Sequence, residues 1–129
     1  METYNTFSGI VIHGSKIGRT MGFPTLNITV KQGNIPKDGV YIVSVLIGDE
    51  HYFGIMSIGN RPTFKENENK TVEIHLLDVT GDWYNTYVNV NPLTFIRSNE
   101  KFNSIDALKS QIEKDKHFAQ NYLASRSRK

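Results

Sequence analysis

The stretch that decides the fold of this chain is Val40-Tyr-Ile-Val-Ser-Val-Leu-Ile-Gly-Asp-Glu-His-Tyr-Phe-Gly-Ile-Met-Ser-Ile58. It contains two short runs rich in β-branched and aromatic residues, 40–47 and 52–58, a composition typical of β-strands. The residues between the runs, Gly48-Asp49-Glu50, are typical of a turn. Because sequential strands joined by such a turn pair antiparallel, the stretch predicts an antiparallel pair.

Four further segments of the same character lie on either side of this pair, at residues 7–13, 26–30, 72–79 and 87–96. The loops that join them are rich in Gly, Pro, Asn and Asp, and no helical stretch separates one strand from the next. A parallel sheet would need crossover segments between its strands. The sequence therefore predicts a small, mostly β protein: a six-stranded antiparallel barrel over about residues 7–97, whose closure would leave no sheet edge exposed.

The spacing of apolar residues changes after Ser104. Apolar residues then recur three, four or seven positions apart, which places them on one face of a helix: Ile105, Leu108, Ile112, Ala119, Tyr122 and Leu123. Ser104 is a favourable N-cap residue, and Asp106 in the first turn complements the helix dipole. We predict one C-terminal α-helix over about residues 104–124, a frayed tail at 125–129, and a single domain over residues 1–129.

The composition excludes several classes of function. The chain has 129 residues, 38% hydrophobic and 22% charged, which is the balance of a folded domain. It contains no cysteine, so it has no disulfide, thiolate nucleophile or cysteine-ligated metal. The net charge is +2, with three positive residues among the last four, so nucleic-acid binding would depend on the tail. The sequence has no signal-like start and no apolar run of about 20 residues, and we expect a cytoplasmic location.

The loop between the first two predicted strands carries the residue types of an anion site. Its glycines would let backbone N–H groups approach a polyphosphate, and Lys16 and Arg19 would neutralise its charge. The hydroxyl of Thr25 and the side-chain carbonyl of Asn27 are suitable ligands for a hard cation such as Mg²⁺. The same composition also fits a long hairpin loop whose glycines serve only tight turns.

Three charged residues outside this loop are further candidates. The alternating pattern of residues 72–79 places Glu73 on the face opposite Val72. Two roles fit this position: a general base at the barrel mouth, or a carboxylate that faces solvent. Arg61 lies in a second candidate phosphate-binding segment that also fits a plain turn. Arg97 is at the end of the last predicted strand, where its side chain fits either of two roles, an ion-pair partner or a ligand contact. His75 is interpreted as structural, because the four histidines lack metal-site spacing.

Short motifs in one order along residues 7–123 carry a resemblance to a known family. They are Gly9-Ile-Val-Ile-His-Gly14, Gly18-Arg-Thr-Met-Gly-Phe-Pro-Thr-Leu-Asn27, Gly39-Val-Tyr41, Ile58-Gly-Asn-Arg-Pro-Thr-Phe64, Val72-Glu-Ile-His-Leu-Leu-Asp78, Trp83-Tyr84, Ile96-Arg97 and Lys101-Phe102. In this order they resemble the riboflavin kinase family. The resemblance implies a Greek-key barrel of six strands with a C-terminal helix. It also implies an ATP-dependent kinase that phosphorylates the ribityl 5′-hydroxyl of riboflavin to give flavin mononucleotide (FMN).

The resemblance further implies roles for individual residues. Glu73 corresponds to the catalytic base, and Thr25 and Asn27 correspond to the ligands of Mg²⁺. Contacts to the nucleotide are implied for Gly14, Lys16, Gly18, Arg19, Gly22, Thr25, Asn27 and Arg61. Contacts to the flavin are implied for Arg97, Tyr84 and Phe102.

Three positions depart from the family's pattern. Leu26 replaces an alanine between the implied metal ligands, Asn85 replaces a glycine after Tyr84, and Asn99 replaces an acidic residue after Arg97. An alternative to the kinase is a non-catalytic sensor of flavin or nucleotide on the same barrel. An oligonucleotide-binding barrel is a weaker alternative, because the strands carry few positive residues. We expect a monomer that binds riboflavin or FMN and ATP or ADP, with no nucleic-acid or membrane partner, either as a stand-alone kinase or as the kinase module of a bifunctional enzyme.

Overall fold

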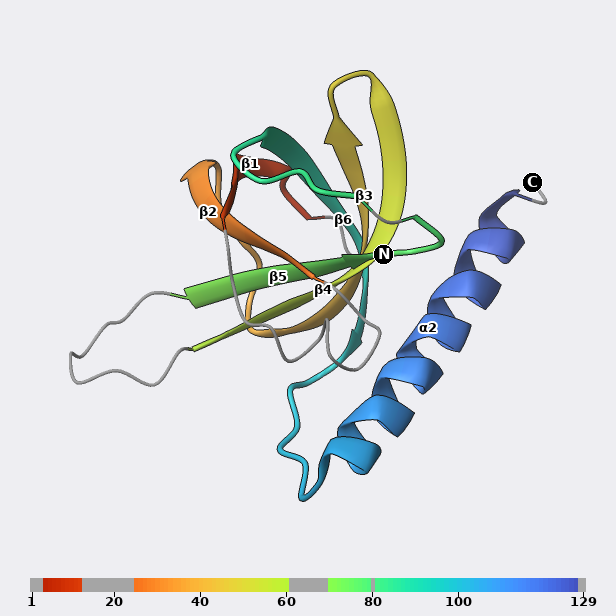
Figure 1. Cartoon of the computed structure of the whole chain (residues 1–129). Helices are drawn as coiled ribbons and strands as arrows, with labels where there is room; N and C mark the ends of the chain where they lie inside the picture. The colour runs from red at the N-terminus through yellow and green to blue at the C-terminus, as the bar shows by residue number, and fades with distance from the viewer. Residues whose placement is uncertain (1–3, 13–24, 61–69, 80, 128–129) are drawn as a thin grey trace. The chain divides into compact units, whose positions relative to one another are not determined.

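The structure, a computed structural model, describes residues 4–12, 25–60, 70–79 and 81–127 (Figure 1). The chain divides into two compact units, Met1–Asn99 and Glu100–Lys129. The second unit contains the helix α2 (Ile105–Ser127). The described residues of the first unit form six strands: β1 (Phe7–Ile12), β2 (Leu26–Gln32), β3 (Gly39–Ile47), β4 (Glu50–Asn60), β5 (Lys70–Leu76) and β6 (Tyr87–Arg97).

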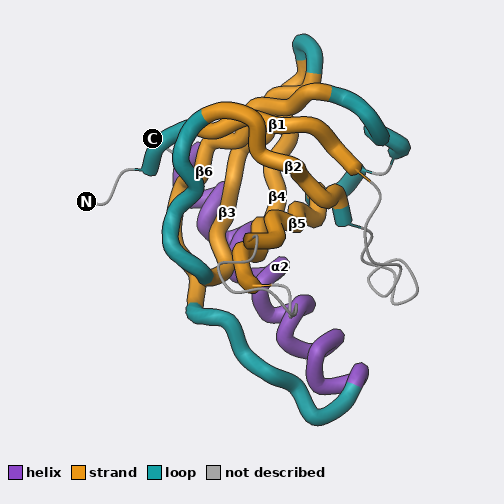
Figure 2. Tube along the Cα trace, turned by 90° about the vertical axis from the view of Figure 1, so that its left-hand side faces the viewer, coloured by secondary structure: helices purple, strands orange, loops and turns teal. Residues whose placement is uncertain are grey.

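The six strands form a closed barrel with the hydrogen-bonded order β1-β2-β5-β4-β3-β6. Each strand pairs antiparallel with both of its neighbours, and the pairing of β1 with β6 closes the ring. In Figure 2 the strands wrap around one interior. The predicted mostly β architecture, a six-stranded antiparallel barrel followed by one C-terminal helix, is therefore confirmed.

The interior of the barrel is filled by alternate side chains of its strands. In β5 the inward residues are Val72, Ile74 and Leu76, and the half-buried Glu73 and His75 lie between them on the outer face, as the alternation predicted. The other strands contribute further buried residues to the same core: Phe7, Val11, Ile28, Tyr41, Val43, Val45, Ile47, Met56, Ile58, Val88 and Val90. The barrel thus keeps Glu73 out of its apolar core while fixing the backbone on both sides of it.

The helix α2 begins at the predicted cap and extends beyond its predicted end. The backbone N–H of Ala107 donates to the Ser104 hydroxyl at 3.1 Å, which satisfies one of the first-turn donors. The helix continues to Ser127, three residues past the expected end at 124. In this last turn the guanidinium of Arg126 lies over the ring of Tyr122, 5.8 Å from its centroid. Residues four apart on a helix are neighbours, so this contact favours the additional turn.

Asn85 supplies a left-handed backbone conformation in the turn before β6. Its φ is +66°, a region that asparagine tolerates better than most residues with a Cβ. Its backbone N–H donates to the Val11 carbonyl at 2.8 Å, and the Val11 N–H donates to the Thr86 carbonyl at 3.0 Å. The turn is therefore joined to the end of β1, and the asparagine satisfies the conformation that a glycine would also adopt.

This conformation gives a testable prediction for stability. We expect Asn85→Ala to lower the free energy of unfolding by about 1–2 kcal/mol, because alanine lacks the local hydrogen bonding that helps asparagine adopt this region. Asn85→Gly should leave stability close to that of the wild type. Urea unfolding measures both changes, with Asn34→Ala as the control at an exposed loop position without a positive φ. Equal losses for Asn34→Ala and Asn85→Ala would contradict the prediction.

Candidate functional site

Glu73 lies in the middle of β5 with a polar residue directly opposite it on each neighbouring strand. Its Cα partners are Asn27 on β2 and Ser57 on β4. Directly opposite residues of an antiparallel pair point to the same face, with Cβ atoms about 4.5–5.5 Å apart. The three side chains therefore form a row across the outer face of the barrel, with the carboxylate in the centre.

Thr25 adds a hydroxyl to this row. It precedes β2, two residues before Asn27, so the two side chains are on the same face of the chain. The Thr25 hydroxyl donates to Oε1 of Glu73 at 3.3 Å, and both residues are half-buried. The structure thus brings together three of the residues singled out in the sequence, Thr25, Asn27 and Glu73.

Asn27 is the most deeply buried member of this group. The residue is 6% exposed, yet its side chain makes no hydrogen bond within the described part of the chain. Its side-chain amide lies directly opposite Glu73 and offers both a donor and an acceptor to a bound group. Its carbonyl oxygen and the Thr25 hydroxyl are neutral oxygen donors of the kind that Mg²⁺ accepts in addition to phosphate oxygens.

No cluster of three or more acidic or histidine side chains suitable for a metal occurs among the residues that the structure describes. A cation at Thr25 and Asn27 would complete its coordination with oxygen ligands from other groups. Nucleotide phosphates supply such ligands in many kinases. The donor set is thus compatible with a metal that arrives with a nucleotide.

The row continues around the barrel to Arg97. Ser57 on β4 is the Cα partner of Val40 on β3, and Val40 is the partner of Arg97 at the end of β6. Arg97 is half-buried, and its Nη1 donates to the carbonyl of Ser98 at 3.1 Å. By this register Arg97 belongs to the same level of the barrel as Glu73, on the side of β4 and β3.

Tyr84 lies beyond the opposite end of the row, on the side of Asn27. It is 50% exposed, and its backbone N–H donates to the carboxylate of Asp82 at 3.0 Å. Its turn is hydrogen-bonded to Val11, and the next residue of β1, Ile12, is the Cα partner of Asn27. Phe102, the third residue assigned to the flavin, is half-buried and belongs to the second unit, before α2.

Six of the predicted nucleotide contacts lie outside the described residues: Gly14, Lys16, Gly18, Arg19, Gly22 and Arg61. The described residues that flank the first of these segments are Ile12 and Thr25. Ile12 pairs with Asn27, so both of these flanking residues lie next to the row that carries Glu73.

Ser57 is a site residue that the sequence did not single out. Its position between the buried Met56 and Ile58 indicates an outward side chain, and the structure shows it exposed. Its position opposite Glu73 depends on the register between β4 and β5, which the composition of the strands does not reveal.

The segments that the structure describes include no helix long and apolar enough to cross a membrane.

Several known proteins are similar to this chain in sequence. The sequence model of the riboflavin kinase (flavokinase) family matches residues 1–123. The bifunctional riboflavin kinase/FMN adenylyltransferase of Bacillus subtilis is 42% identical over 120 residues, which cover 91% of this chain and 38% of that protein. The chain therefore spans well under half the length of this relative.

Solved structures give the same fold. A structure named as a macrolide-efflux protein from Streptococcus pneumoniae superposes with a TM-score of 0.83 at 36% identity, covering 90% of this chain and 38% of that one. The riboflavin kinase of Trypanosoma brucei superposes with a TM-score of 0.62 at 27% identity, covering 92% of this chain and 79% of that one. Because the family model and the Bacillus relative both extend over nine-tenths or more of the sequence, this chain belongs to the riboflavin kinase family.

Proposed function

We propose that this chain transfers the γ-phosphoryl group of ATP to the ribityl 5′-hydroxyl of riboflavin, which gives FMN and ADP. The observation that carries the proposal is the row in which Asn27 and Ser57 flank Glu73 directly, with the Thr25 hydroxyl bonded to its carboxylate. Phosphoryl transfer needs little covalent chemistry from the protein and depends on positioning and on stabilisation of charge. A base beside neutral oxygen donors meets this need.

In the proposed reaction Glu73 acts as the general base. Its carboxylate accepts the proton of the 5′-hydroxyl as the oxygen of that hydroxyl forms a bond to the γ-phosphorus of ATP. The bond between the γ-phosphorus and the β,γ-bridging oxygen breaks, and ADP leaves. The hydrogen bond from Thr25 fixes one oxygen of the carboxylate, so the other oxygen remains available for the substrate.

Thr25 and Asn27 would hold Mg²⁺, which neutralises the charge of the nucleotide phosphates when it is bound. The position of the Asn27 amide directly opposite Glu73, on the same face as the Thr25 hydroxyl, supports this assignment. We assign the remaining nucleotide contacts to Gly14, Lys16, Gly18, Arg19, Gly22 and Arg61. The pairing of Ile12 with Asn27 supports a nucleotide on this side of Glu73.

The flavin is assigned to Arg97, Tyr84 and Phe102. Arg97 lies on the same row as Glu73, separated from it by Ser57 and Val40, which is compatible with a substrate that extends along the outer face. A monomeric state and a cytoplasmic location stay predictions from the sequence.

The alternative is a protein that binds flavin or nucleotide without turnover. Incubation of the chain with riboflavin, ATP and Mg²⁺, followed by chromatography of the flavins, separates the two functions. The kinase predicts FMN formation that needs all three components. Binding of riboflavin and ATP without FMN above the protein-free background would overturn the proposed reaction and favour the sensor.

A further inference from the structure

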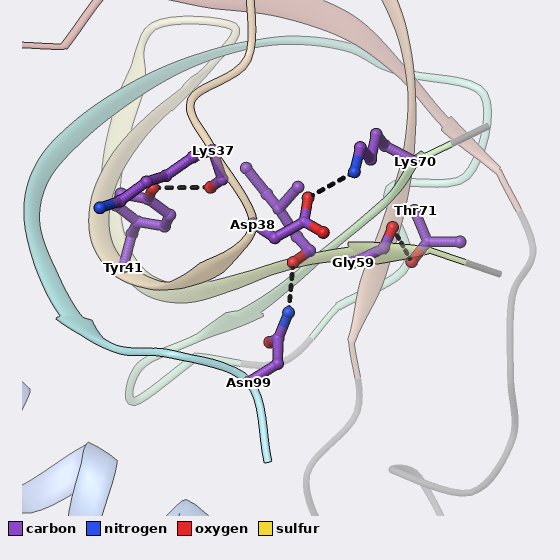
Figure 3. Close-up of polar contacts among 8 residues, drawn as sticks. Lys37, Asp38, Tyr41, Gly59, Lys70, Thr71 and Asn99 are labelled. Carbon is purple, nitrogen blue, oxygen red and sulfur yellow. Dashed lines mark hydrogen bonds and ion pairs between the residues drawn. The ribbon is translucent and has the colours of Figure 1, made fainter. Parts of the chain in front are cut away.

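The end of β4 is held by side chains from other parts of the barrel (Figure 3). The Asn99 side chain donates from Nδ2 to the carbonyl of Ile58 at 2.8 Å. The Thr71 hydroxyl donates to the carbonyl of the next residue, Gly59, at 3.3 Å. Asn99 comes from the chain after β6 and Thr71 from β5. Two successive carbonyls of β4 are thus bonded to side chains from two different segments.

The bond from Asn99 occurs where the ladder between β3 and β4 ends. Gly39 is the first residue of β3 and is the Cα partner of Ile58. Its φ of +148° is rarely adopted by residues with a side chain. A Cβ atom added to Gly39 would also clash with the ring of Phe95. The chain before Gly39 therefore does not continue the strand. A backbone carbonyl needs a donor, and the Asn99 amide provides it at the point where the strand pairing ends.

This bond joins β4 to the segment after β6, although β3 lies between β4 and β6 in the barrel. Asn99 follows Arg97 by two residues, and Arg97 ends β6. The acceptor, Ile58, is next to both neighbours of Glu73. Ile58 follows Ser57, which is opposite Glu73 on β4, and it pairs with Val72, which precedes Glu73 on β5. One side-chain bond thus connects the segment that carries Arg97 to the strand pair that carries Glu73.

We propose that Asn99 is a positioning residue that holds the Arg97 segment against β4 and thereby sets the affinity for the flavin. The inference rests on the proposed function, in which Arg97 contacts riboflavin. The bond requires a donor on the side chain, because the Ile58 carbonyl can only accept, and an ionised carboxylate has no proton to donate. An aspartate of the same shape would lose the bond and place a negative charge against the Ile58 carbonyl.

Steady-state kinetics of Asn99→Asp, Asn99→Ala and Asn99→Gln test the proposal. For Asn99→Asp we expect the KM for riboflavin to rise about 3- to 10-fold, the effect of one lost hydrogen bond, with kcat and the KM for ATP changed less than about twofold. Asn99→Ala should show a similar or smaller rise. Asn99→Gln keeps the donor and should recover part of the affinity.

Asn89→Asp is the matched control. Asn89 is exposed on the same strand as Arg97, eight residues earlier, and its side chain makes no hydrogen bond among the residues described here. The substitution changes the charge in the same way and should leave all kinetic constants unchanged. An Asn99→Asp variant with the wild-type KM for riboflavin would overturn the role of Asn99 and leave the kinase reaction standing.

Hydrogen exchange separates this result from a failure of the kinase itself. If the Ile58 bond holds the segment, amides of residues 97–99 should exchange faster in Asn99→Asp than in the wild type, without any ligand. Unchanged exchange would overturn the positioning role. A wild-type chain that forms no FMN would overturn the proposed function, and the exchange result would then decide whether Asn99 holds the segment.

Discussion

Replacing Glu73 with glutamine is expected to lower kcat by about 100- to 10,000-fold, the usual contribution of a general base. Glutamine keeps the size of the side chain and can still accept the hydrogen bond from Thr25. It cannot accept the proton of the 5′-hydroxyl. The dissociation constant for riboflavin, followed by flavin fluorescence, should therefore change much less than kcat.

Glu50→Gln is the control for this substitution. Glu50 is exposed at the start of β4, whereas Ser57, the neighbour of Glu73, lies near the end of that strand. The same chemical change at Glu50 should leave turnover at the wild-type level. If Glu73→Gln retained turnover within about threefold of the wild type, another group would have to take the proton.

The second large effect is expected at Asn27. Asn27→Ala should raise the Mg²⁺ concentration needed for half-maximal activity by roughly 10- to 100-fold, because a buried polar partner of the metal contributes about 1–3 kcal/mol. The side chain makes no hydrogen bond within the described part of the chain, so its removal breaks no hydrogen bond seen there. The thermal midpoint should therefore change little. Titration of activity with Mg²⁺ at saturating ATP and riboflavin measures the effect.

Thr29→Ala provides the comparison on the same strand. Thr29 lies two residues after Asn27 on the same outer face of β2 and is half-buried. Its truncation removes a similar polar group without touching the proposed metal site, so the Mg²⁺ dependence should stay at the wild-type value. An unchanged Mg²⁺ dependence in Asn27→Ala, or a variant that unfolds, would show that the amide is structural.

The spacing of apolar and polar residues along the sequence was sufficient to predict the strands and the C-terminal helix of this fold. Alternation of apolar and polar residues predicted the strands and correctly placed Val72 inside the barrel and Glu73 outside it. The cap at Ser104 was also predicted correctly. These features depend on residues close together in the chain, where residue type and spacing determine the local structure.

The arrangement across strands could not be predicted in the same way. Asn27 and Glu73 are far apart in the sequence, and their pairing depends on the register between β2 and β5. A shift of one residue would keep the composition of both strands and turn every side chain to the opposite face. The position of Ser57 beside Glu73 and the bond from Asn99 to Ile58 depend on register and on the end of β3, so both required the structure.

The pairing of β6 with both β1 and β3 has a consequence for synthesis on the ribosome. Phe7 of β1 is paired with Val90, and Ile47 of β3 with Val88, so both strands keep an unpaired edge until β6 has been made. At about 5–20 residues per second, β1 waits on the order of 4–17 s for its partner. An unpaired edge invites association with other chains during this interval. The nascent chain is therefore most exposed to aggregation before its sixth strand emerges, and completion of β6 ends that exposure for both edges at once.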